Sequence, residues 1–393
     1  MSTSRLSLLA FASFSLVQSA LAQSVHLVKE GESLWLIAKQ AGVSVDAIRK
    51  ANQLKNDVIW EGARLIIPAP QPSLTPDPPT HSPPPLREIA SQPSKRTTPK
   101  TPLTEKGMQI LQLQVMLDRA GFSPGIIDGY EGKYTQLAKT LCEAWNPAAL
   151  SSPLPATRLA QVPPSWRSYV DSQLPGSGSS PDFKALTANP QVIRYYSALE
   201  YLAERFHCSE GLLKKLNPRT DFTNLRTGAQ LTVPNVIPFE LERYFDSQGK
   251  GVWSSGLGKG GPDRTVYISA SDMMLTIWEG TQLIRSYPIT LNEDDSPRGQ
   301  RQLGAITPGP NYMRRKTKLE LLPGPNSPVG IVWCPLGDGF GIHGTSNPAT
   351  IGRASSSGCV RLANWDAVRF AKMVRKGTTV MISQRDQQYK PKN

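Results

Sequence analysis

The chain has 393 residues and a formal net charge of +13, from 44 Lys and Arg residues against 31 Asp and Glu residues. This length predicts two to four domains, and the charge favours polyanionic surroundings. Because no nucleic-acid-binding motif accompanies the basic residues, we expect no nucleic acid among the partners.

The N-terminus has the pattern of a secretory signal over residues 1–22. Arg5 supplies the positive start, Leu6 to Val17 is apolar, and Ala20-Leu21-Ala22 forms a cleavage site. The alternative is a transmembrane anchor, but the apolar run is shorter than the ~20 residues that a span needs. We therefore expect an exported protein without a transmembrane anchor, located in the periplasm or cell wall.

Residues 25–68 show a strand, two capped helices and a closing strand. Val25–Val28 alternates as a strand, Ser33 and Ser44 are N-caps, and residues 62–68 form a turn and a strand. This βααβ order and its residues resemble a LysM module. The resemblance implies binding to glycan strands that contain N-acetylglucosamine, and a purely structural module is the alternative.

Residues 69–104 contain 11 prolines in 36 positions. This density favours extended polyproline II and prevents a packed core, so the segment is predicted to be a linker.

Residues 105–146 have helical periodicity, with a break at Gly121 and a loop over residues 124–132. The Gly, Asp-Gly and Thr spacing resembles the helical peptidoglycan-binding domain. The usual Phe-Gln near the end is replaced by Leu141-Cys142, so a ligand-binding role and a structural role both stay open.

An internal repeat connects the first module with residues 190–236. Leu34 to Asn52 align without gaps to Leu199 to Asn217, an offset of 165 (199 − 34). The asparagines at the two ends, Asn52 and Asn217, are identical. This unit resembles a degenerate LysM module without a clear first strand, and we expect it to pack against the C-terminal domain over residues 264–384.

Residues 264–384 are predicted to form a β-rich sandwich with one helix. Strands are expected at 265–269, 274–278, 283–289 and 379–382, with a hairpin turn at 279–282 and a helix at 365–375. The predicted fold class of the whole chain is therefore α+β and multidomain.

A histidine and a cysteine stand 16 residues apart (359 − 343) in this segment, each in a Gly/Ser-rich frame: Ile342-His343-Gly344 and Ser356-Ser357-Gly358-Cys359. An imidazole can take the proton of a thiol and so activate it as a nucleophile. The other three histidines, His26, His81 and His207, lie outside this segment. The four cysteines form no CxxC pair, so no metal and no other cofactor is predicted. No disulfide is predicted among Cys142, Cys208 and Cys334.

Ile-His-Gly-Thr followed by Ser-Ser-Gly-Cys-Val-Arg-Leu resembles the signature of the YkuD-type L,D-transpeptidase family, with Ser357 where many members have a second histidine. The resemblance implies that Cys359 is the nucleophile, that His343 is the general base, and that the Gly344 carbonyl orients the imidazole. Backbone N–H groups around Ser357 and Gly358 are expected to stabilise the oxyanion. Arg361 either holds a substrate carboxylate or belongs to a structural network.

The resemblance further implies peptidoglycan as the partner. The enzyme would cleave a stem tetrapeptide before its terminal D-alanine through a thioester. It would then join the freed carbonyl to another stem peptide, as a 3–3 cross-link, or to a lysine of a wall-attached protein. Two alternatives stay open: an L,D-carboxypeptidase that uses water, and a non-catalytic peptidoglycan-binding anchor protein.

Overall fold

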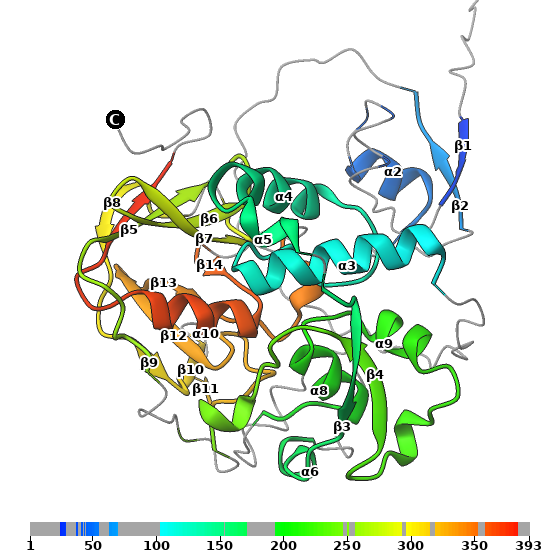
Figure 1. Cartoon of the computed structure of the whole chain (residues 1–393). Helices are drawn as coiled ribbons and strands as arrows, with labels where there is room; N and C mark the ends of the chain where they lie inside the picture. Colours follow the sequence, from blue (N-terminus) through cyan, green and yellow to red (C-terminus); the bar gives the residue numbers. More distant parts are fainter. Residues whose placement is uncertain are drawn as a thin grey trace, which may run out of the picture. The chain divides into compact units, whose positions relative to one another are not determined.

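The computed structural model describes residues 24–28, 37, 41, 43, 45–54, 63–69, 103–152, 154–170, 193–246, 250, 256–292, 296–314, 319–352 and 358–383. They belong to two compact units, which divide between residues 89 and 90 (Figure 1). The predicted signal segment and nearly all of the predicted linker lie outside the described residues. Ser33, Ser44 and Ser357 also lie outside them.

The first unit contains an antiparallel pair of strands and a helix: β1 (Ser24–Leu27), β2 (Arg64–Ile67) and α2 (Val45–Ala51). A small core of its own holds these elements together. It is formed by Val28, Ile37, Ile48, Leu65 and Ile67. Residues along β2 are alternately exposed and buried. This is the pattern of a strand whose one face packs on the helix while the other faces water.

One asparagine ties the second helix of each LysM-like unit to its closing strand. Asn52 Nδ2 donates to the Ile48 and Ile66 carbonyls at 2.8 and 2.7 Å, and Ile66 N–H donates back to Asn52 Oδ1. Asn217 makes the same three bonds to Leu213 and Thr232. The identity of these two asparagines in the repeat therefore has a structural cause: each satisfies a helix end and a strand with one side chain.

The second LysM-like unit starts earlier than the repeat predicted. Its closing strand β4 (Gln230–Pro234) pairs antiparallel with β3 (Thr157–Gln161), so the first strand lies upstream of residue 190. The helices α8 (Ala198–Arg205) and α9 (Glu210–Leu216) complete the βααβ order, each with a serine N-cap. A short helix α6 (Trp166–Tyr169) and the 3₁₀ helix η1 (Phe222–Asn224) belong to its connections. The predicted range 190–236 contains both helices and β4 but not β3, since strand pairing is not limited to neighbouring sequence.

The helical segment consists of α3 (Glu105–Ala120), α4 (Lys133–Trp145) and the short α5 (Ala148–Ser151). Gly121 ends α3 in a left-handed conformation with φ of 86°, which confirms the predicted break. The predicted loop that follows is held by the buried Gln114 side chain, which accepts from the N–H groups of Asp128 and Gly129.

Two sheets form the C-terminal part. A five-stranded sheet has the order β7 (Gln282–Pro288), β6 (Met274–Glu279), β5 (Arg264–Ser269), β15 (Thr379–Ile382) and β8 (Gly299–Gln302). A four-stranded sheet has the order β14 (Val360–Arg361), β13 (Phe340–His343), β12 (Val332–Gly337) and β9 (Thr307–Pro308). The remaining elements are the pair β10 (Tyr312–Arg314) and β11 (Leu319–Leu321) and the 3₁₀ helices η2 (Leu241–Arg243) and η4 (Pro348–Thr350).

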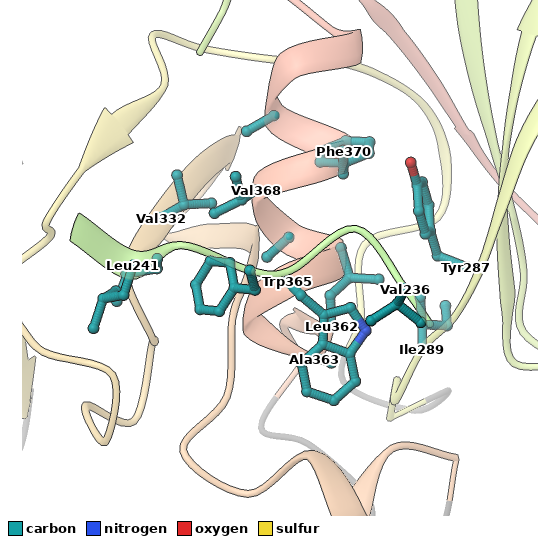
Figure 2. Close-up of a cluster of buried hydrophobic side chains, with 14 of the residues drawn as sticks. Val236, Leu241, Tyr287, Ile289, Val332, Leu362, Ala363, Trp365, Val368 and Phe370 are labelled. Carbon is teal, nitrogen blue, oxygen red and sulfur yellow. The ribbon is translucent and has the colours of Figure 1, made fainter. Parts of the chain in front are cut away.

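The helix α10 (Asn364–Met373) lies in the middle of the core of the second unit, as Figure 2 shows. Its buried side chains include Trp365, Val368 and Phe370, which lie among residues of both sheets and of the segment after β4. One hydrophobic core therefore runs through the helical segment, the second LysM-like unit and the two C-terminal sheets.

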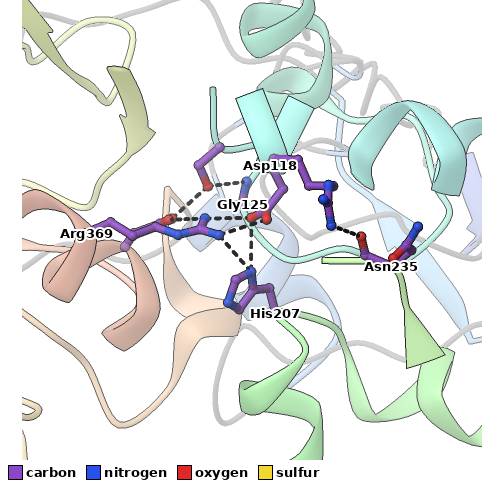
Figure 3. Close-up of polar contacts among 8 residues, drawn as sticks. Asp118, Gly125, His207, Asn235 and Arg369 are labelled. Atoms are coloured by element: carbon purple, nitrogen blue, oxygen red, sulfur yellow. Dashed lines mark hydrogen bonds and ion pairs between the residues drawn. The ribbon is translucent and has the colours of Figure 1, made fainter. Parts of the chain in front are cut away.

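A buried polar cluster joins these three parts (Figure 3). Asp118 of α3 is fully buried and receives two hydrogen bonds from Arg369 of α10, at 2.7 and 2.9 Å. His207, which follows α8, contacts the same carboxylate at 3.0 Å and stacks on Trp365. His207 lies outside residues 264–384, as predicted, yet its ring is buried against Trp365 of α10 in that segment.

Asp118→Asn should lower the free energy of unfolding by about 2–4 kcal/mol. Removing one partner of a buried pair strands the other charge, and the partial exposure of Arg369 moderates the cost. Burial raises the pKa of Asp118, but Arg369 and His207 outweigh it and hold that pKa well below its ordinary value. The contribution of the Asp118 contact to the free energy of unfolding should therefore be complete above about pH 4 and should decrease as the pH falls below that value.

Chemical denaturation at pH 7 and at pH 3 measures this difference. Asp338→Asn is the matched control, because Asp338 pairs with Arg301 at the surface and should matter by less than about 1 kcal/mol. Equal stabilities of the two variants would contradict the role given to Asp118.

Candidate active site

Strand pairing brings the predicted histidine and cysteine together. β13 and β14 run parallel, with His343 opposite Arg361 and Ile342 opposite Val360. Paired residues point to the same face, and side chains alternate along a strand. His343 and Arg361 therefore share one face of the sheet, and Cys359 directly precedes β14. Charge interactions of Arg361 with both the Cys359 thiol and the His343 imidazole agree with this placement.

The cysteine strand is held from both sides. Leu362 N–H donates to the His343 carbonyl at 2.9 Å, and Arg361 exchanges two backbone hydrogen bonds with Thr290. Directly before Cys359, Gly358 has φ of 95°, a conformation that favours glycine, and its carbonyl accepts from the Ser296 hydroxyl at 2.9 Å. These bonds fix the backbone on both sides of the thiol.

The imidazole of His343 is buried and oriented by one short hydrogen bond. Nδ1 lies 2.6 Å from the Gly344 carbonyl oxygen. Because a carbonyl only accepts, Nδ1 carries the proton, and Nε2 keeps its lone pair. Burial lowers the pKa of His343 to about 4; the bond to Gly344 opposes that shift and the charge of Arg361 adds to it. The ring is therefore a neutral proton acceptor at pH 7.

Trp333 of β12 is a site residue that sequence reasoning missed. It is the cross-strand partner of His343, and their rings stack at 5.4 Å. The same indole lies where a side chain at Gly341 would be. Trp333 lies outside both sequence motifs. Its place beside His343 could have been predicted only from the register of the hairpin, whose turn lies at Gly337–Gly339.

A second concave site lies on the second LysM-like unit. It is a cavity of about 720 Å³ between the start of α8, the end of α9 and the loop that follows α9. Its wall includes the Trp166 ring, against which the Arg167 guanidinium lies at 4.8 Å. The Trp166 indole N–H is buried and has no hydrogen-bond partner within the described part of the chain.

Trp333→Ala should raise the pKa of His343 from about 4 towards the ordinary value near 6.5, because burial is the main cause that lowers it. The measurement is an NMR titration of the ring in a Cys359→Ala background, which removes coupling to the thiol. His207 gives an internal control in the same spectra. An unchanged His343 titration would show that Trp333 does not shield the ring.

The comparisons with known proteins agree on one family. The sequence profile of the YkuD L,D-transpeptidase catalytic domain matches residues 263–382, and the LysM domain profile matches residues 26–68 and 198–234. A Bacillus subtilis protein named as the L,D-transpeptidase YkuD is 31% identical over 195 residues, which cover 49% of this chain and 96% of that protein.

The corresponding Bacillus licheniformis protein is 26% identical over 188 residues, or 47% of this chain and 93% of that protein. A solved L,D-transpeptidase structure from Stackebrandtia nassauensis is 11% identical and covers 58% of this chain and 96% of that one. The TM-score of this comparison is 0.28. The match to nearly the whole Bacillus subtilis protein nevertheless settles the family: this chain belongs to the YkuD family of L,D-transpeptidases and carries LysM domains in addition.

Proposed function

We propose that the chain is an exported enzyme that cleaves peptidoglycan stem peptides and transfers the freed carbonyl to an acceptor through a thioester at Cys359. The observation that carries the proposal is the parallel pairing of β13 and β14, which brings the backbone next to Cys359 alongside a neutral, oriented His343. Among the described residues no helix is long and apolar enough to cross a bilayer. Export itself rests on the signal pattern at the N-terminus.

The first half of the reaction forms the thioester. Cys359 Sγ attacks the carbonyl carbon of the third stem residue, while His343 Nε2 takes the thiol proton. The C–N bond to the terminal D-alanine breaks, and the proton passes from His343 to the leaving amine. With a pKa of about 4, His343 gives little imidazolium at rest, so the proton leaves the thiol during attack rather than before it.

The second half consumes the thioester. An acceptor amine attacks the carbonyl, gives its proton to His343 and expels the Cys359 thiolate, which is then protonated again. Backbone N–H groups at Ser357, Gly358 and Cys359 are proposed to bind the oxyanion, and Arg361 is proposed to face the substrate carboxylate. An amine of a second stem peptide gives a cross-link, a protein lysine gives attachment, and water gives hydrolysis.

The LysM domains imply binding to peptidoglycan, and we propose that the cavity beside Trp166 receives the glycan. An indole offers an apolar face on which a sugar ring can pack. The helical segment 105–146 is proposed to connect parts of the molecule rather than to bind ligand, since α3 contributes Asp118 and much of its surface to the shared core.

His343→Gln should lower turnover of a tetrapeptide muropeptide by about 10²–10⁴-fold, because it removes the general base. Cys359→Ala should abolish turnover. Mass spectrometry of the products measures both and identifies the acceptor from the product mass. His26→Gln, in the first unit, is the matched control and should leave turnover unchanged. Turnover by Cys359→Ala comparable to the parent would refute the mechanism.

Trp166→Ala should weaken cosedimentation of the mature chain with insoluble peptidoglycan. The loss should be larger in a chain that also lacks residues 24–69, because the first LysM domain then no longer binds in parallel. Leu159→Ala is the control, as Leu159 is an exposed apolar residue on β3 that does not line the cavity. If Trp166→Ala in the shortened chain sediments as the shortened parent does, the cavity is not a glycan site.

A further inference from the structure

The chain that leaves β7 passes beside the proposed nucleophile and is held there by hydrogen bonds. Thr290, two residues after the end of β7, is buried and exchanges backbone hydrogen bonds of 3.0 and 2.9 Å with Arg361 of β14. Its hydroxyl group accepts from the Gly352 N–H at 2.7 Å and donates to the Thr350 carbonyl at 3.0 Å. These four bonds anchor the segment beside the strand that follows Cys359.

Ser296 anchors the same segment on the other side of the nucleophile. It lies six residues after Thr290 (296 − 290), and only 9% of it is exposed. Its N–H donates to the Asn292 carbonyl at 3.0 Å, and its hydroxyl group donates to the Gly358 carbonyl at 2.9 Å. Because Gly358 directly precedes Cys359, this one short segment holds the backbone both before and after the thiol.

The Ser296 hydrogen bond acts on a peptide group that glycine leaves easy to rotate. Gly358 has φ of 95°, and a residue without a Cβ lets the peptide group that follows it turn at little steric cost. A hydrogen bond to the Gly358 carbonyl selects one of these orientations. A trans peptide group is planar, so its N–H points opposite to its carbonyl. The Cys359 N–H therefore points away from Ser296.

We propose that Ser296 is a positioning residue: by holding the Gly358 carbonyl, it aims the Cys359 N–H at the oxyanion that forms when the thiol attacks a carbonyl. The inference rests on the proposed role of Cys359 as the nucleophile and deepens it. When Sγ bonds to the carbonyl carbon, the carbonyl oxygen gains the negative charge. A donor whose direction is already fixed stabilises that charge without reorganisation. Ser296 acts through the backbone and takes no part in bond making.

Two reactions of Cys359 separate this role from a general effect on the thiol. With p-nitrophenyl acetate, Sγ attacks the ester carbonyl, p-nitrophenolate leaves, and an acetyl thioester forms through an oxyanion. With iodoacetamide, Sγ bonds to a methylene carbon and iodide leaves, so no oxyanion forms. In both reactions the thiol loses its proton. A residue that aims an oxyanion donor should therefore affect the first reaction and spare the second.

Ser296→Ala in the mature full-length chain at pH 7 should lower the acylation rate of Cys359 by about tenfold or more, and the alkylation rate by less than about threefold. Deleting a whole oxyanion donor costs about 10²–10³-fold, whereas this variant only loosens the direction of one. Ser296→Thr keeps a hydroxyl group and should stay within about threefold of the parent in both reactions. Mass spectrometry of the peptide that contains Cys359 measures both rates, with Cys359→Ala as the blank.

Ser383→Ala is the matched control for the loss of a buried serine hydroxyl group. Ser383 directly follows β15, is buried, and accepts from the Ala270 N–H at 3.2 Å. With near-UV circular dichroism confirming that every variant is folded, this control should keep both rates of the parent. Unchanged acylation in Ser296→Ala, an equal fall of acylation and alkylation, the same fall in Ser383→Ala, or a Ser296→Thr as slow as Ser296→Ala would each overturn the positioning role.

Turnover of a tetrapeptide muropeptide distinguishes this inference from the proposed function. Both halves of the proposed reaction pass through an oxyanion, so Ser296→Ala should lower kcat by about the same factor as ester acylation, with KM within about threefold of the parent. A parent that the ester acylates at Cys359 but that turns over no muropeptide would sink the proposed function alone. An active parent whose kcat Ser296→Ala leaves unchanged would sink the positioning role alone.

Discussion

The second unit depends on the buried contact of Asp118 with Arg369 and His207 (Figure 3). These three side chains come from α3, from the end of α8 and from α10, which are far apart in sequence. A carboxylate at full burial needs both partners, so none of the three elements can move away without exposing an unpaired charge. The contact therefore fixes how the helical segment, the second LysM-like unit and the catalytic sheets meet.

The short extended stretch after Gly121 strengthens this junction. Ser123 N–H donates to the Ser286 carbonyl of β7, while Ile127 exchanges backbone hydrogen bonds with His207 and Ser209. One piece of chain thus adds to the catalytic sheet at one end and to the LysM-like unit at the other. The sequence predicted three separate domains here: the helical segment, the second LysM-like unit and the C-terminal sheets. In the structure they share one core and one set of backbone hydrogen bonds.

This arrangement packs the proposed active-site residues against the shared core. The proposed base His343 ends β13, and the proposed nucleophile Cys359 directly precedes β14. These short parallel strands by themselves offer few hydrogen bonds. Asn364 beneath Gly344, Trp333 beside His343 and α10 behind the sheet supply the rest. Because the imidazole is buried, it stays neutral at pH 7, and its orientation depends on the Gly344 carbonyl and the Trp333 ring.

The sequence alone determined what depends on local order: the break of α3 at Gly121, the repeat that ends in Asn52 and Asn217, and the His343 and Cys359 motifs. Local conformation and short spacings carry these features, so pattern reading reached them. Tertiary structure alone decided that β3 opens the second LysM-like unit, that Trp333 covers His343, and that His207 and Glu204 lie inside. Each of these depends on pairing between distant segments, and a side chain's burial is set by its distant neighbours rather than by its adjacent residues.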